Sequence, residues 1–305
     1  MNHRGLLALA SLLLLLGSVA TRAEEKAETP KIRVILIDGQ NNHDWRTTTP
    51  ILKKELESCG RFTVDVSSYL RKVDKPGKVE KTAPFPPELA KYDVVLSNYN
   101  GEPWPKEFQQ ALDDSLKEGK IALVIVHAAN NSFEGWKEYN QMIGMGWRGN
   151  NFGARLTLDA DGKEKHVDKG FGPGAGHGPK HPFQLVVRDR SHPITKDMPA
   201  EWMHASDELY HGMRGPVQNV TLLATAHSDK ATGGTGEHEP MIWTVSYGKG
   251  RVFHTPMGHD AEAMRCYGFI ATVQRGTEWA ATGKVTVPLP KQFPSPEKVS
   301  LAPEK

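Results

Sequence analysis

Three histidines each follow an apolar, strand-like segment of this sequence. They are His43 after residues 32–37, His127 after residues 121–126, and His259 after residues 251–255. In an open parallel α/β sheet, ligands bind in the crevice outside the carboxyl ends of the strands. If these strands are neighbours in the sheet, we expect the three imidazoles to converge on one pocket. Converging imidazoles suit a metal site or acid–base chemistry.

His127 occupies a position at which many α/β enzymes carry their nucleophile. Those enzymes place Ser or Cys on the turn that directly follows a central strand. Here the strand is followed by His-Ala-Ala-Asn, and the nearby Ser132 lacks the Gly-x-Ser-x-Gly frame of a hydrolase. The sequence therefore disfavours an acyl-enzyme mechanism.

A second group of reactive side chains begins at Asp207, where the sequence reads Asp-Glu-Leu-Tyr-His. On a strand, the first, third and fifth of these side chains lie on one face and the other two on the opposite face. Glu208 and Tyr210 therefore form one set, and Asp207 belongs to the other. Only one of the two sets can face a common pocket.

Asp260 directly follows His259 and has two interpretations. Its carboxylate could orient the His259 ring, as carboxylates do for metal ligands and catalytic bases, or it could cap the helix that follows. His177 and His181 flank a Gly-Pro-Lys turn, where we expect solvated side chains.

The N-terminal residues predict export. Residues 1–23 show a short basic start, an apolar run over residues 6–19 and small residues before a cleavage site, the pattern of a signal peptide. A membrane anchor is the alternative, but the run is shorter than the roughly 20 residues that span a bilayer. We expect a bacterial protein of the periplasm or the extracellular space.

Composition excludes a further class of partner. Lys plus Arg number 38 and Asp plus Glu 36, so no strong electrostatic field favours the binding of nucleic acid or anionic lipid.

The two cysteines, Cys59 and Cys266, lie in separate helical segments, and export would permit a disulfide between them. Spacing alone leaves both the paired and the free state open.

The remaining chain predicts one α/β domain over residues 31–283. Strand-like and helical segments alternate up to residue 126, which is typical of a doubly wound, mostly parallel sheet. We expect one of Thr47, Thr48 and Thr49 to cap the first helix, with Pro50 in its first turn. Residues 241–247 and 251–255 predict an antiparallel pair that extends the sheet.

Two segments lack a regular pattern. Residues 144–178 are rich in glycine, so we expect a loop or an active-site cover there. Residues 284–305 form a proline- and charge-rich tail that we expect to be mobile.

Aromatic and amide side chains cluster in the expected loops. Such groups suit a polyhydroxylated ligand, because rings stack on sugars and amides both donate and accept hydrogen bonds. Ordinary loop packing is the alternative. The candidate substrate contacts are Asn42, Trp45, Asn130 and Trp147.

Several motifs together resemble the trehalose-utilisation, or ThuA-like, family. They are Gly-Gln-Asn-Asn-His-Asp-Trp from Gly39, Val-His-Ala-Ala from Val126, His-Pro-Ile-Thr from His192, Asp-Glu-Leu-Tyr from Asp207, Pro-Met-Ile-Trp from Pro240, Gly-Arg-Val-Phe from Gly250 and Gly-His-Asp from Gly258. The resemblance runs from about residue 31 to residue 281.

The resemblance implies a fold of the flavodoxin-like, class I glutamine amidotransferase-like kind. Amidotransferases use a Cys at the elbow, where this chain has His127, so that activity is not carried over. The resemblance also implies carbohydrate metabolism, including 3-keto sugars, and a bound divalent metal. The positions that match the family's polar motifs are His43, His127, Glu208, Tyr210 and His259.

We therefore expect an exported, sugar-active enzyme that performs hydrolysis, isomerisation or elimination. His43, His127 and His259 would bind a metal, for which zinc is favoured. His127, Glu208 and Tyr210 would be catalytic, with Glu208 a fourth ligand or general base and Tyr210 a proton donor or substrate contact. The expected partner is a small carbohydrate, with no nucleotide cofactor.

Two alternatives remain. A metal-free enzyme would use His127 and His259 as an acid–base pair beside a carbonyl. A carbohydrate-binding protein without turnover would use the aromatic and amide side chains alone.

Overall fold

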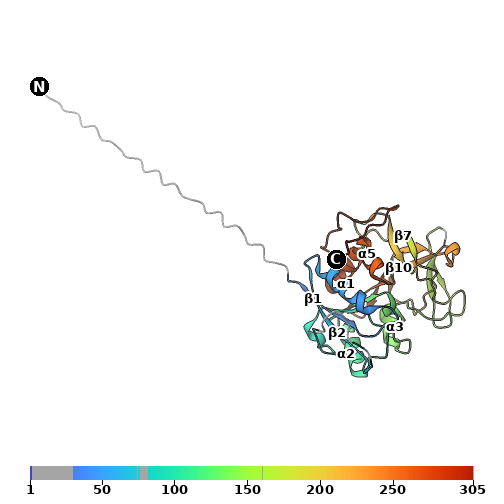
Figure 1. Cartoon of the computed structure of the whole chain (residues 1–305), viewed down its shortest axis with the longest axis horizontal. Helices are drawn as coiled ribbons and strands as arrows, with labels where there is room; N and C mark the ends of the chain where they lie inside the picture. Colours follow the sequence, from blue (N-terminus) through green and yellow to red (C-terminus); the bar gives the residue numbers. More distant parts are fainter. Residues whose placement is uncertain (2–29, 74, 76–81, 160, 305) are drawn as a thin grey trace. The chain divides into compact units, whose positions relative to one another are not determined.

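The computed structural model describes residues 1, 30–73, 75, 82–159 and 161–304 of the chain. The predicted signal peptide therefore lies outside the described residues except for Met1. Residues 31–305 form one compact unit (Figure 1). Among the described residues, no helix combines the length and the apolar character that a membrane crossing needs.

The unit alternates strands and helices in its first half and is rich in strands in its second. The strands are β1 (Ile32–Asp38), β2 (Phe62–Ser68), β3 (Val94–Ser97), β4 (Ala122–Val126), β5 (Arg155–Leu158), β6 (Glu164–Val167), β7 (His181–Val187), β8 (Glu201–Asp207), β9 (Val220–His227), β10 (His238–Tyr247) and β11 (Gly250–Thr255). The helices are α1 (Trp45–Glu57), α2 (Lys106–Lys117), α3 (Lys137–Ile143), α4 (Ala261–Met264) and α5 (Tyr267–Thr282), with short 3₁₀ turns η1 (Leu89–Lys91), η2 (His127–Asn131) and η3 (Lys230–Thr232).

The strands form one mixed sheet in the order β2-β1-β3-β4-β11-β10-β9-β7-β8. The strands from β2 to β11 in this order are parallel, and those from β10 onward continue the sheet in antiparallel pairing. The predicted fold class is confirmed. Of the three strands that lead to the histidines, β4 and β11 are neighbours, whereas β3 separates β1 from β4. All three still end at the same edge of the sheet.

Helices cover both faces of the parallel half. Val34 and Leu36 of β1 pack in the core layer that contains α1 and α5, and Ile35 and Ile37 pack in the layer that contains α2 and α3. This division follows from the alternation of side chains along a strand. A strand buried on both faces has a continuous apolar sequence, as β1 does. Helices α1 and α5 contact each other on their side of the sheet (Figure 1).

The first helix begins earlier than the threonine run predicted. Asp44 is its N-cap, and the carbonyl of Asp44 accepts hydrogen bonds from the amides of Thr47 and Thr48 at 3.0 Å each. The hydroxyl of Thr47 donates to the Asp44 carboxylate at 2.6 Å instead of capping the helix. Pro50 lies inside α1 and not in its first turn, so the expected cap was wrong.

The glycine-rich segment is more ordered than expected. Residues 144–178 contain the hairpin of β5 and β6, and β5 also pairs with β10. Leu156 and Leu158 of β5 are buried in the core. Of the two alternatives, loop or active-site cover, the loop is therefore wrong for β5 and β6, because four-residue strands leave little periodicity to detect.

The C-terminal tail lies against the domain. The amide of Tyr267 donates to the carbonyl of Ser300 at 2.9 Å, and the amide of Ala302 donates to Arg265 at 2.8 Å. These contacts contradict the mobile tail that proline content and charge predicted. The cysteines are both free, Cys59 exposed and Cys266 buried, so the disulfide left open by the sequence is absent here.

Candidate functional site

The three histidines of the strand ends lie together. The ring centroids of His43 and His127 are 4.6 Å apart, those of His43 and His259 are 4.7 Å apart, and those of His127 and His259 are 5.5 Å apart. Burial and the neighbouring imidazoles lower the pKa of His43 to about 4. We refer to these three residues as the histidine cluster.

His127 is held on a strained turn between β4 and η2. Its φ is 47°, in the left-handed region that residues other than glycine rarely adopt. The elbow geometry of the nucleophile enzymes is thus present with an imidazole in place of Ser or Cys. The Nδ1 atom lies 2.7 Å from the carbonyl oxygen of Pro256. Because a carbonyl can only accept, Nδ1 carries the hydrogen, and the lone pair of Nε2 faces the cluster.

Glu208 is the carboxylate of the cluster. Its Oε1 lies 3.2 Å from Nε2 of His259, and its Oε2 lies 3.7 Å from Nε2 of His127. Burial acts to raise the pKa of Glu208, but the hydrogen bond and charge of His259 outweigh it, so the pKa is lowered and the side chain is ionised at neutral pH. Oε2 is buried and has no hydrogen-bond partner.

Tyr210 contacts the same group from the side of His127. Its hydroxyl lies 3.2 Å from Nε2 of His127, to which it can donate. Burial raises the pKa of the Tyr210 phenol, which therefore stays protonated. Strand β8 ends at Asp207, so Glu208 and Tyr210 lie just beyond it. Their side chains nevertheless face the same pocket, as the alternation of side chains along a strand predicted.

His259 and Asp260 fulfil both interpretations of the sequence. Nδ1 of His259 faces Oδ2 of Asp260 at 3.3 Å, and Oδ1 of Asp260 accepts hydrogen bonds from the amides of Glu262 and Ala263 at the start of α4. Interactions with Asp260 and then Glu208 raise the pKa of His259 to about 9. The ring is therefore an imidazolium at neutral pH in the metal-free protein.

Asp207 points away from the cluster and fixes its backbone. Its Oδ1 accepts from the amides of Glu208 at 2.7 Å and His259 at 3.1 Å, and its Oδ2 accepts from Gly258 at 2.7 Å. Oδ2 also lies 2.8 Å from Nε2 of His204, and both side chains are fully buried. One carboxylate thus positions both Glu208 and His259.

His177 joins the site although its sequence position predicted a solvated side chain. Its Nε2 lies 3.4 Å from Oε1 of Glu208, and its ring stacks on Tyr210 with centroids 5.9 Å apart. Nδ1 lies 2.7 Å from the carbonyl of Gly178, so it too donates to a backbone oxygen. No local pattern distinguishes His177, because its contacts depend on the path of the preceding glycine-rich loop.

That loop is fastened to the domain by Arg214. The guanidinium of Arg214 is buried and donates to the carbonyl oxygens of Pro173 and Asp168. A side chain at Gly176 would meet Nε2 of His211 at 2.8 Å, so glycine leaves room for that ring. This loop, the C-terminal part of the glycine-rich segment, therefore covers the site in a fixed position and places His177 beside Glu208.

The candidate substrate contacts differ in their placement. Trp147 lies at the site, with its ring 4.6 Å from that of Tyr210. Asn42 is exposed beside the cluster, and its Nδ2 lies 3.0 Å from Nε2 of His43.

The other two candidates are buried, although Trp45 also lines a cavity beside the cluster. Asn130 is fully buried, and its Nδ2 contacts Nε2 of His254 at 3.2 Å, so its side chain faces the core. Trp45 is only 3% exposed, and the guanidinium of Arg46 lies 4.3 Å over its ring. Side chains in loops can fill the core behind a site, which residue type alone does not reveal.

The cluster has the donor set of a cation site. One potential ligand atom each from His43, His127 and Glu208 lies within 4.8 Å of the other two. Three imidazoles share one arrangement around Glu208: in each, Nδ1 lies near an oxygen atom and Nε2 lies near the Glu208 carboxylate. They are those of His127, His177 and His259. Metal-binding histidines use their second nitrogen in this way.

Comparison with known proteins gives matches among families and solved structures. A family model described as trehalose utilisation (ThuA) matches residues 33–280. A ThuA-like protein from Parabacteroides merdae is 41% identical, with a TM-score of 0.80 over 90% of this chain and 98% of that one. A ThuA-like protein from Bacteroides uniformis is 18% identical, with a TM-score of 0.57 over 85% of this chain and 95% of that one, which supports the fold. No curated protein matches the sequence.

Proposed function

Because this chain belongs to the ThuA family, which is linked to trehalose utilisation, we propose that it is a metal-assisted enzyme acting on trehalose-like or 3-keto sugars. The reaction would be a hydrolysis, isomerisation or elimination. The elbow carries His127 in place of a nucleophilic Cys, which argues against amidotransfer.

The unsatisfied oxygen of Glu208 among the imidazoles is the observation that supports a metal most directly. Oε2 of Glu208 is a buried acceptor without a donor, and it faces Nε2 of neutral His127 at 3.7 Å. The hydroxyl of Tyr210 is within reach of Nε2 but not bonded to Oε2. A buried carboxylate oxygen without a donor is unfavourable unless a proton or a cation lies beside it. His43, His127, His259 and Glu208 would hold the ion, and nitrogen ligands with one carboxylate favour zinc.

When bound, a divalent ion polarises a carbonyl or activates water. The residues of the chain supply the rest. Tyr210 holds a proton on its hydroxyl beside His127, where it can be donated to a substrate oxygen. Glu208 is an ionised ligand or general base, and Trp147 packs against Tyr210 to form one wall of the site.

Turnover and metal dependence test the proposal together. We expect wild-type protein with zinc to convert a 3-keto-disaccharide or trehalose, and a chelator to abolish the conversion until zinc is restored. Product analysis by mass spectrometry checks both, with His127→Ala as the inactive comparison.

Two results would contradict the proposal. Unaltered turnover in the chelator, with no bound metal, would favour the metal-free acid–base enzyme. Sugar binding by both forms, with conversion by neither, would favour the carbohydrate-binding protein.

The proposal includes export, because residues 1–23 carry the pattern of a signal peptide. We expect protein recovered from the periplasm or the medium to begin at Glu24. N-terminal sequencing checks this, and a protein that keeps Met1 in the cytoplasm would contradict it.

A further inference from the structure

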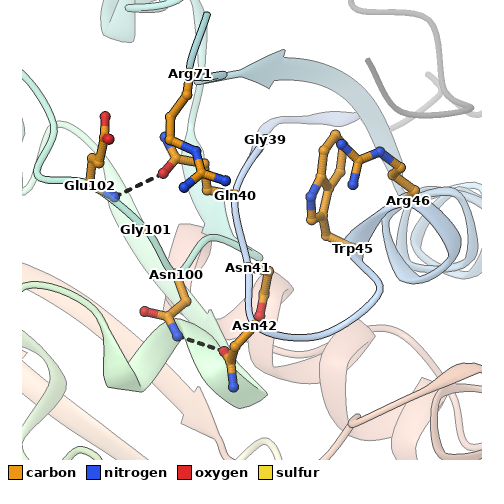
Figure 2. A pocket seen from close by; sticks show the side chains of 10 residues that line it. All are labelled: Gly39, Gln40, Asn41, Asn42, Trp45, Arg46, Arg71, Asn100, Gly101 and Glu102. Carbon is orange, nitrogen blue, oxygen red and sulfur yellow. Dashed lines mark hydrogen bonds between the residues drawn. The ribbon is translucent and has the colours of Figure 1, made fainter. Parts of the chain in front are cut away.

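A polar cavity lies beside the histidine cluster. Its volume is about 300 Å³, and its walls come from the loop after β1, the start of α1, Arg71 and the loop after β3 (Figure 2). Building on the proposed function, we propose that this cavity binds the second sugar unit of a neutral disaccharide whose first unit lies at the histidine cluster.

Asn42 connects the two spaces. Its side chain lines the cavity, and its Nδ2 lies 3.0 Å from Nε2 of His43. Its Oδ1 accepts a hydrogen bond from Asn100 at 2.6 Å, and Asn100 lines the same cavity (Figure 2). A ligand that contacts Asn42 from the cavity is therefore separated from the histidine cluster only by the Asn42 side chain. The two linked rings of a disaccharide could occupy these two neighbouring spaces.

The chemistry of the lining suits a sugar. Asn42 and Asn100 offer amides, which both donate and accept, as the hydroxyl groups of a sugar do. None of the described residues that line the cavity has an aliphatic side chain, so an acyl chain or an apolar peptide would gain little there. The volume lies at the small end of the range for ligand pockets, about 300–1,000 Å³, which suits a single ring.

The lining carries charges of both signs. Arg46 and Arg71 lie on opposite sides of the loop after β1, and Glu102 adds a negative charge to the wall (Figure 2). The guanidinium of Arg46 already lies over the ring of Trp45 and donates to the carbonyl of Lys75 at 2.6 Å. Arg46 is thus already engaged by the protein, and the hydroxyl groups of a sugar can accept hydrogen bonds from its remaining N–H groups.

Hydrogen bonds link the walls of the cavity. Nε2 of Gln40 donates to the carbonyl of Tyr69 at 3.2 Å, and Oε1 accepts from the amide of Glu102 at 3.1 Å. A side chain at Gly101 would meet Oε1 of Gln40 at 2.5 Å, so glycine allows the two loops this close approach. A preformed site loses little affinity to the ordering of side chains.

Binding to trehalose and to glucose separates this proposal from the one on which it rests. Isothermal titration calorimetry of the zinc-loaded protein should show at least about tenfold tighter binding of trehalose than of glucose. Arg46→Gln and Asn100→Ala should each reduce this preference by about tenfold, the size expected when a good hydrogen bond is lost. Arg190→Gln is the matched control, because Arg190 is exposed and does not line the cavity.

Equal affinity for trehalose and glucose in the wild type would overturn the cavity proposal, as would an unchanged preference in both cavity variants. Tighter binding of an acidic disaccharide than of trehalose would overturn the assignment to a neutral sugar. Product analysis on the same samples tests the enzyme separately. Protein that shows the preference but converts neither sugar would support the cavity and contradict the proposed catalysis.

Discussion

Replacing Glu208 by glutamine should remove most of the bound metal and lower turnover by at least about 10²-fold, the lower end of the range for general acid–base groups. The variant has nearly the same shape but lacks the negative charge that faces His259 at 3.2 Å and His127 at 3.7 Å. Its amide would also point a hydrogen-bond donor toward the space that the cation is expected to occupy. Both changes act on the site, and we expect the fold to be retained.

Elemental analysis and turnover of the same preparation measure the two effects of Glu208→Gln. Glu164→Gln is the matched control, because Glu164 is exposed on β6. A Glu208→Gln variant that keeps both its metal and its turnover would show that the carboxylate has neither of the roles assigned to it.

Asp207→Asn should lower the free energy of unfolding by about 3–5 kcal/mol, the effect typical of breaking a buried ion pair. Asp207 and His204 are both fully buried, with 2.8 Å between Oδ2 and Nε2. The substitution leaves the His204 imidazolium without its counter-charge. It also weakens the acceptor for the amides of Gly258 and His259. Urea unfolding measures the change, with the exposed Asp161→Asn as control.

The same pair predicts how stability depends on pH. Burial acts to lower the pKa of His204, but interactions with Asp207 and then Cys266 outweigh it, and the pKa is raised to about 9. A raised pKa contributes stability that is complete below the unfolded value of about 6.5 and is lost as the pH rises through about 9. Wild-type protein should therefore lose stability between these values. An equal loss in Asp207→Asn would contradict the ion pair.

The sequence predicts best what depends on periodicity. Continuous apolar strands indicated the parallel half of the sheet, because such strands are buried on both faces. The ends of those strands then placed His43, His127 and His259 at one edge. The position of His127 directly after β4 also predicted the elbow, whereas the contact of its ring with Pro256 could not be read from the sequence.

Other features depend on long-range contacts that no local pattern encodes. His177 reaches Glu208 because Arg214 and close glycine contacts fix the path of the cover. Asn130 has the side chain of a sugar contact but faces the core, where it contacts His254. The tail past α5 has the composition of a mobile end, yet its backbone pairs with Arg265 and Tyr267. Composition describes what a segment could bind, whereas the fold decides what lies next to it.

Crystallography of zinc-soaked protein, with anomalous data collected at the zinc edge, tests the metal site most directly. We expect one strong peak between the imidazoles of His43, His127 and His259, at about 2.0–2.2 Å from their nitrogens and from a carboxylate oxygen of Glu208. A cluster that remains without a peak while zinc binds elsewhere, or a protein that binds no zinc, would contradict the account.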